Sequence, residues 1–74
     1  MHTATTRLGV ALRRRRIERG IGLDTAAEEV GVSRSTLATA ERGEAVPSPS
    51  TAWKMAAWLG WTWIQVCDAA VTKV

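Results

Sequence analysis

The chain has 74 residues, which is enough for one small domain and too few for two. Ten Lys and Arg, eight of them Arg, stand against seven Asp and Glu; this +3 balance suits a polyanionic partner but is common among small domains. A single cysteine excludes an internal disulfide. The sequence also lacks a signal-peptide pattern and an apolar stretch near the roughly 18 residues of a membrane span, so we expect a cytoplasmic protein with no membrane contact.

The first predicted helix follows a polar tail, residues 1–5, that is expected to be flexible. Thr5 or Thr6 can cap this helix, which continues through Arg19. Residues 13–16 are all arginines, and at about 100° per residue they cannot share one face, so at least two are expected to lie in solvent. The side chains expected to face inward are Leu8, Ala11 and Leu12.

Residues 23–42 carry the pattern of two short helices joined by a tight turn. Ala26 and Val30 lie four residues apart, on one face of the first of these helices. Gly31 follows where a helix-ending glycine reaches positive φ without a Cβ penalty, and Ser33 can cap the next helix. The two helices are therefore expected to pack on each other at a steep angle.

The last third of the sequence predicts a loop and two further helices. Two prolines at residues 43–50 favour a loop, and a fourth helix follows at about residues 50–59. Thr62 can cap a last helix that ends near Ala70. The predicted organisation is all-α, with the flexible tail at 1–5, a domain at 6–70 and a loose end at 71–74.

The ordered set of motifs resembles the helix-turn-helix of the phage repressor and Cro (Xre-type) family of DNA-binding proteins. No single piece is very specific, but the set covers roughly residues 7–66. The resemblance implies a five-helix repressor-like domain that inserts the helix at about 34–42 into the major groove of DNA. The motifs that carry it are Leu8-Gly9, Arg16-Ile17-Glu18-Arg19-Gly20, Gly31-Val32-Ser33-Arg34-Ser35-Thr36, Glu41-Arg42-Gly43, Pro47-Ser48 and Leu59-Gly60.

The exposed side of the helix at 34–42 supplies the candidate DNA contacts. If Leu37, Ala40 and Glu41 face inward, Arg34, Ser35, Ala38 and Thr39 remain to read bases. Family position favours Ser35 and Thr39 as readers, whereas Arg34 suits either guanine, bidentately, or a phosphate. The expected phosphate contacts are Thr36, Arg42, Ser48, Ser50, Arg13 and Arg14.

The resemblance also implies a buried ion pair between Arg16 and Glu41, which would join the first helix to the third. At two places the sequence departs from the family pattern, and at both we expect fewer contacts with the DNA backbone. Leu23 replaces a residue that is commonly Gln, and residues 44–46 lack the basic side chains often found in this loop.

Catalysis finds no support in the sequence. His2 lies in the tail, and Cys67 has no second Cys or His at metal-ligand spacing. Glu28 and Glu29 are neighbours on a helix and point about 100° apart, which does not suit a paired-carboxylate site. We therefore expect no enzyme, no metal, no cofactor and no small-molecule ligand.

Four tryptophans at positions 53, 58, 61 and 63 cannot all be buried in so small a domain. Trp61 is expected to fill the core. The resemblance places Trp63 and Ile64 near the two-fold contact of a homodimer on DNA, while the alternative is that the indoles cover the core of a monomer.

Two functions are compatible with these patterns. The first is a transcriptional regulator of the Cro or repressor type, binding a palindromic double-stranded operator near the nucleoid of a bacterial host. The second is a protein-interaction module, such as an antitoxin or adaptor, with weak DNA binding. Fold class alone does not choose between them.

Overall fold

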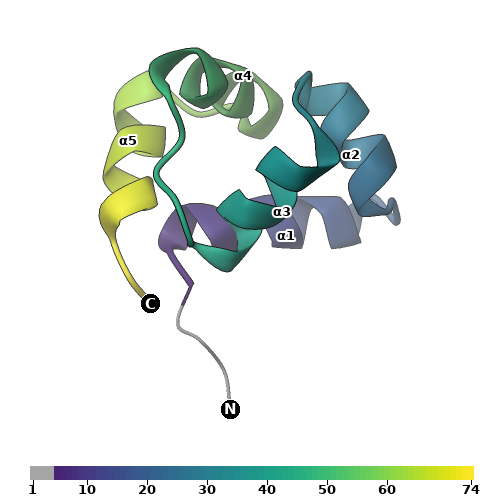
Figure 1. Cartoon of the computed structure of the whole chain (residues 1–74), viewed down its shortest axis with the longest axis horizontal. Coiled ribbons are helices and arrows are strands. Elements are labelled where there is room, and N and C mark those ends of the chain that lie inside the picture. The colour runs from purple at the N-terminus through teal and green to yellow at the C-terminus, as the bar shows by residue number, and fades with distance from the viewer. Residues whose placement is uncertain (1–4) are drawn as a thin grey trace.

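The computed structural model describes residues 5–74, and the chain there forms five helices and no extended strand (Figure 1). The predicted all-α fold with a helix-turn-helix is therefore confirmed. The expected flexible tail lies, apart from Thr5, outside the described residues. The helices are α1 (Arg7–Glu18), α2 (Leu23–Val30), α3 (Arg34–Arg42), α4 (Pro49–Leu59) and α5 (Trp63–Val71).

Local sequence signals set the ends of these helices. The hydroxyls of Thr6, Ser33, Ser48 and Thr62 each accept a hydrogen bond from a backbone N–H in the first turn of the helix that follows. Thr62 also forms a capping box, because its own N–H donates to the side chain of Gln65 at 2.7 Å. These caps explain why the helix bounds lie within a residue or two of those predicted.

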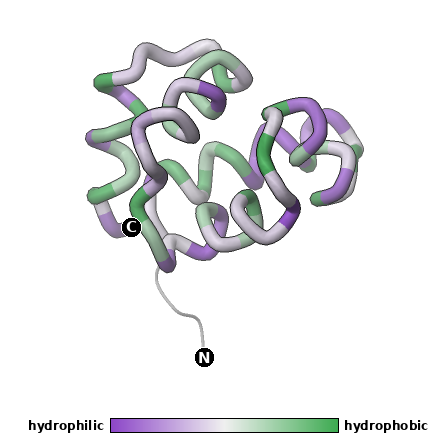
Figure 2. The backbone as a smooth tube through the Cα atoms, turned by 45° about the horizontal axis from the view of Figure 1, so that its top comes forward, coloured by the Kyte–Doolittle hydropathy of each residue, from purple (hydrophilic) through white to green (hydrophobic). Residues whose placement is uncertain are grey.

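The core is built from one buried stripe on each helix. Figure 2 agrees with this, because it shows hydrophobic and hydrophilic residues mixed within the helices rather than sorted into different ones. Seven of the thirteen buried apolar residues are alanines, which let the helices approach closely. Leu59 and Trp61 are only partly buried and pack against this core. The buried apolar residues are Leu8, Leu12, Ala26, Ala27, Val30, Leu37, Ala40, Ala52, Met55, Ala56, Val66, Ala69 and Ala70.

The first helix is the hub of the arrangement. It packs against α3, α5 and α4, while α2 packs on α3 and α4. Gly9 marks the closest approach: a Cβ built there would lie 2.5 Å from the backbone oxygen of Glu41 and 2.9 Å from that of Ala40. The end of α3 is therefore fixed against the first turns of α1, as Figure 1 shows with α3 crossing in front of α1.

The two ends of the described chain are joined to each other. The N–H of Arg7 donates to the carbonyl of Thr72 at 2.8 Å, and the N–H of Val74 donates to that of Thr5 at 3.0 Å. Lys73 also donates from Nζ to the carbonyl of Gly43 at 3.1 Å. Of residues 71–74, which were expected to be loose, Val71 ends α5, and Thr72 and Val74 make the backbone hydrogen bonds given above. None of the helices in residues 5–74 is long and apolar enough to cross a membrane.

Candidate nucleic-acid interface

Two features orient α3: the cap at its start and the inward stripe along it. Leu37 is fully buried and Ala40 nearly so, which turns the opposite side of α3 outward. The Ser33 hydroxyl accepts from the Thr36 N–H at 3.0 Å and donates to Oγ1 of Thr36 at 2.8 Å, leaving the Thr36 hydroxyl hydrogen available to another acceptor. Of the four candidate base readers, Arg34 and Ser35 are exposed, and Ala38 and Thr39 are half-buried.

One groove runs between α3 and the start of α4. It has a volume of about 320 Å³, and its lining includes Thr36, Thr39 and Ser48. The hydroxyls of Ser48 and Ser50, two predicted phosphate contacts, lie 3.4 Å apart at the exposed N-terminus of α4. The positive end of that helix dipole lies at these hydroxyls, so this edge of α3 offers donors rather than charges to an anion.

A second groove, of about 250 Å³, lies between α1, the start of α2 and α3. Its lining includes Arg13, Leu23 and Arg42. Leu23 is half-buried and packs against the core, so its place at the start of α2 serves packing. Arg13 on α1 and Arg42 at the end of α3 both line this groove and could reach a shared polyanion.

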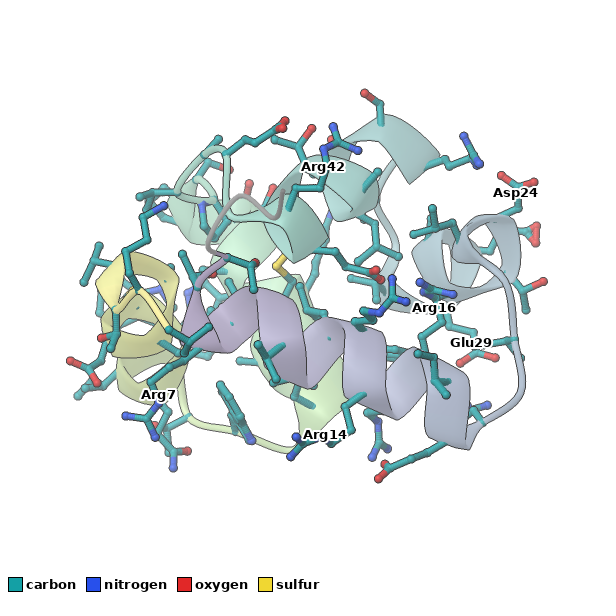
Figure 3. All side chains as sticks on the ribbon, turned by 90° about the horizontal axis from the view of Figure 1, so that it is seen from below. Arg7, Arg14, Arg16, Asp24, Glu29 and Arg42 are labelled. Atoms are coloured by element: carbon teal, nitrogen blue, oxygen red, sulfur yellow. The ribbon has the colours of Figure 1, made fainter. Side chains whose placement is uncertain are left out.

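Arg14 lies elsewhere. It lines a different groove together with Arg7 and Trp61, and Figure 3 shows Arg14 and Arg7 on the side of α1 opposite Arg42 and Asp24. The 100° step between neighbouring helical residues thus separates Arg14 from Arg13. Arg13 and Arg14 share one groove with Glu41, but of the two only Arg13 also lines the groove beside Ala38 and Arg42.

The Arg16 and Glu41 side chains meet at the base of the second groove. Nε and Nη2 of Arg16 each donate to one carboxylate oxygen of Glu41 at 2.9 Å, and the two side chains are 14% and 7% exposed. Hydrogen bonding to Glu41 raises the pKa of Arg16 above its ordinary value. This bidentate contact links α1 to the last turn of α3, in the pairing that the resemblance implied.

Both exposed arginines of α3 are paired with carboxylates. Nε of Arg34 lies 3.0 Å from Oδ1 of Asp24 at the start of α2. Nε and Nη2 of Arg42 contact Glu44 at 3.0 and 3.1 Å, and this hydrogen bonding lowers the pKa of Glu44. Sequence reasoning missed the role of Asp24, because the pairing depends on how the two helices of the motif are angled.

A polar cluster on another side of α1 accounts for two more arginines. The guanidinium of Arg15 lies 5.7 Å from the ring centroid of Trp58. Nε1 of Trp58 donates to Glu29 at 3.1 Å, and Arg19 pairs with the same carboxylate at 3.0 Å. These contacts join α1, α2 and α4, so Arg15 and Arg19 are engaged in contacts between helices of the domain.

The apolar candidates for a dimer contact lie at the start of α5. Trp63 stacks on Trp53 of α4, with ring centroids 6.3 Å apart and planes at 22°. Trp53, Trp63 and Ile64 are 63%, 38% and 72% exposed. We call these three exposed residues, the aromatic pair and the isoleucine that follows Trp63 in α5, the tryptophan surface.

Among the described residues, no group of three or more His, Cys, Asp or Glu side chains is placed to hold a metal ion.

Residues 7–62 match the model of a protein family described as "Helix-turn-helix domain". No protein with a curated description matches the sequence.

Among solved structures, the chain is similar to the crystal structure of an HTH_3 family transcriptional regulator from Vibrio cholerae, with a TM-score of 0.66 and 34% identity. The similarity covers 82% of this chain but 34% of the regulator, so the chain spans about a third of that protein's length. Since the family model covers residues 7–62 and the ordered motifs fall at their expected places, the chain belongs to the Xre-type helix-turn-helix family.

Proposed function

We propose that this domain binds double-stranded DNA by inserting α3 into the major groove, and that it regulates transcription by occupying an operator. The observation that carries the proposal is the outward side of α3, where Arg34, Ser35, Ala38 and Thr39 are accessible between two grooves. Arginine can donate bidentately to guanine, hydroxyls can bond to any base edge, and the methyl groups of Ala38 and Thr39 suit thymine. The similarity to a transcriptional regulator supports the same reading.

The DNA backbone would be held on both sides of α3. Hydroxyls of Thr36, Ser48 and Ser50 serve one strand, and Arg13 and Arg42 serve the other. Arg14 is left out, because it projects from the other side of α1. With two cationic contacts per domain, the logarithm of the binding constant should fall against the logarithm of salt with a slope of only about −2 per domain.

We further propose that two domains bind one palindromic site through their tryptophan surfaces. Trp53 and Trp63 supply stacked aromatic area, and Ile64, the next residue of α5, is largely exposed. Aromatic side chains are enriched in the centres of protein interfaces. Two recognition helices would then lie about 34 Å apart, one turn of duplex.

A protein-interaction function is the second candidate. The tryptophan surface favours it, and so do the carboxylates that neutralise Arg34 and Arg42 on the outward side of α3. In this case the domain would bind DNA weakly and hold its partner through the tryptophans. Salt dependence separates the two functions, because DNA binding through two cationic contacts per domain should weaken as salt rises, whereas apolar contacts through the tryptophan surface should not.

The test combines mobility-shift titrations on random duplex at several salt concentrations with selection of bound sites from a random DNA pool. Arg13→Ala and Arg14→Ala form a matched pair that removes one charge each from neighbouring positions of α1, about 100° apart around the helix. Arg13→Ala should weaken binding to all sequences and reduce the salt slope by about one, while Arg14→Ala should change neither. Equal effects of the two variants would mean that overall charge, not the proposed geometry, drives binding.

The same selection tests the readers. Arg34→Ala should weaken binding by about 1–3 kcal/mol and relax preference at one base pair, and Thr39→Ala should alter preference more than affinity. A uniform loss over all sequences would make Arg34 a phosphate contact. An unchanged selected site would remove Thr39 from the readers.

A further inference from the structure

Asp24 and Arg34 form a pair across the turn of the helix-turn-helix. Asp24 lies in the first turn of α2, and Arg34 is the first residue of α3. Oδ1 of Asp24 lies 3.0 Å from Nε of Arg34, and the two side chains are 84% and 64% exposed. The salt bridges among the described residues give neither group another partner, and Figure 3 shows Asp24 at the outer edge of α2.

The atom that makes this contact decides what the arginine can still do. Nε is the inner nitrogen of the guanidinium, and the terminal nitrogens donate no hydrogen bond to any residue in the described part of the chain. A bidentate contact with guanine O6 and N7 needs two donors on one edge of the planar group. The carboxylate attracts the guanidinium toward the start of α2 without taking a hydrogen bond from it, so the donors stay available to a base while fewer positions of the side chain are favoured, which lowers the conformational entropy lost on binding.

The same carboxylate acts against the DNA backbone. Asp24 places a negative charge at the start of α2, where the helix dipole and free N–H groups would otherwise attract a phosphate. Leu23 beside it has no polar side-chain atom to offer. Asp24 therefore repels DNA of every sequence.

On the basis of the proposed DNA binding, we propose that Asp24 is a positioning residue that raises the base selectivity of Arg34 and lowers the affinity of the domain for DNA in general. The ion pair contributes little in the free protein, because water surrounds both groups. Exclusion of water from the major-groove contact strengthens it. The effect on selectivity and the effect on general affinity then have opposite signs, which no purely structural role of an exposed residue would produce.

Glu44 provides a matched control. It is also an exposed carboxylate paired with an exposed arginine of α3, at 3.0 Å from Nε of Arg42. Arg42, however, lies at the C-terminal end of the helix and is assigned to a phosphate rather than a base. Removing the charge of Glu44 should strengthen binding to all sequences without changing preference.

The experiment measures binding of the whole chain, by fluorescence anisotropy at one salt concentration, to the selected duplex, to its single-base variants and to random duplex. Asp24→Asn, Glu44→Gln and Arg34→Ala are compared with the unsubstituted chain, and circular dichroism checks that each is folded. Asp24→Asn should raise affinity for random duplex and lower preference at the base pair read by Arg34, each by about two- to fivefold, the range of one exposed ion pair. Glu44→Gln should raise affinity about equally for all duplexes.

Three results would overturn the inference while leaving DNA binding intact. Asp24→Asn could retain full preference, Glu44→Gln could lower the same preference as strongly, or Arg34→Ala could leave preference unchanged. Absence of salt-dependent binding by the unsubstituted chain would instead remove the proposed function, and this inference with it. That failure is recognised before any variant is compared.

Discussion

Breaking the contact between Arg16 and Glu41 should remove a large share of the free energy of unfolding of the domain. About nine tenths of both side chains are out of water, and removal of one partner from such a pair costs about 3–5 kcal/mol. A domain of 74 residues has a total stability of about 4–11 kcal/mol. Glu41→Met should lower the free energy of unfolding by an amount at the upper end of this range, because the guanidinium left behind cannot lose its proton. Arg16→Met should lower the free energy of unfolding by about 3 kcal/mol.

The double variant decides whether these costs arise from the pair itself. Replacing both partners by Met leaves no unpaired buried charge, so the loss should be well below the sum of the single losses. The assay is urea unfolding followed by far-ultraviolet circular dichroism, with sucrose added to fold the weakest variants. Additive losses would refute the reasoning, and Arg13 or Arg15 would then have to be tested as the partner.

The pair of Arg42 and Glu44 supplies the control for this cycle. Nη2 of Arg42 donates to one carboxylate oxygen of Glu44 at 3.1 Å and Nε lies 3.0 Å from the other, but the two side chains are 57% and 51% exposed. The same substitutions there should be close to additive, because water screens the two charges. Equal coupling in the two cycles would mean that burial does not set the strength of the Arg16 contact.

Three further changes test the packing and the interface. Gly9→Ala should destabilise the domain by about 1–3 kcal/mol in the same urea assay, because its Cβ would meet the carbonyls at the end of α3; an unchanged midpoint would show that α1 and α3 can separate freely. Gly22→Ser should stabilise by about 0.5–1 kcal/mol, since Gly22 caps α2 without a side-chain hydrogen bond and a Cβ there has open space; a loss of stability would contradict this. Trp63→Ala should reduce two proteins per operator to one in sedimentation, whereas Val71→Ala, at another exposed apolar residue of α5, should not; one unsubstituted protein per operator would exclude the dimer.

Features fixed by near neighbours in the sequence were predictable. The range of α3 agrees with that expected from the sequence, because its cap, Ser33, and its terminating glycine, Gly43, act on adjacent backbone groups. The backbone pairing of Thr5 with Val74 has no side-chain signal and was missed. The different directions of Arg13 and Arg14 could be predicted from the sequence, because neighbouring helical residues point about 100° apart. Which of the two lines the groove beside Arg42 could not be predicted, because it depends on how α1 packs.

Contacts between helices account for the rest. The cluster of Arg15, Trp58 and Glu29 joins three helices, so no pattern within one helix could reveal it. The ion pair of Asp24 with Arg34 depends on the angle between α2 and α3, which the turn at Gly31 sets. Sequence patterns therefore locate the candidate readers on α3, whereas the partners that tune those readers become visible only when the helices are placed together.

The contacts that stabilise this domain also orient the helix proposed to read DNA. Gly9 lets α1 touch the last carbonyls of α3, and Arg16 binds the carboxylate of Glu41, one residue before Arg42. The direction of α3 is thus set at the C-terminal end of α3 by contacts with α1, and at the start of α3 by the turn that follows α2. A change at this junction that leaves the domain folded should still tilt α3 and weaken several base contacts together. Loss of preference at many base pairs at once therefore indicates a fault in packing, whereas loss at one base pair indicates the loss of a single reader.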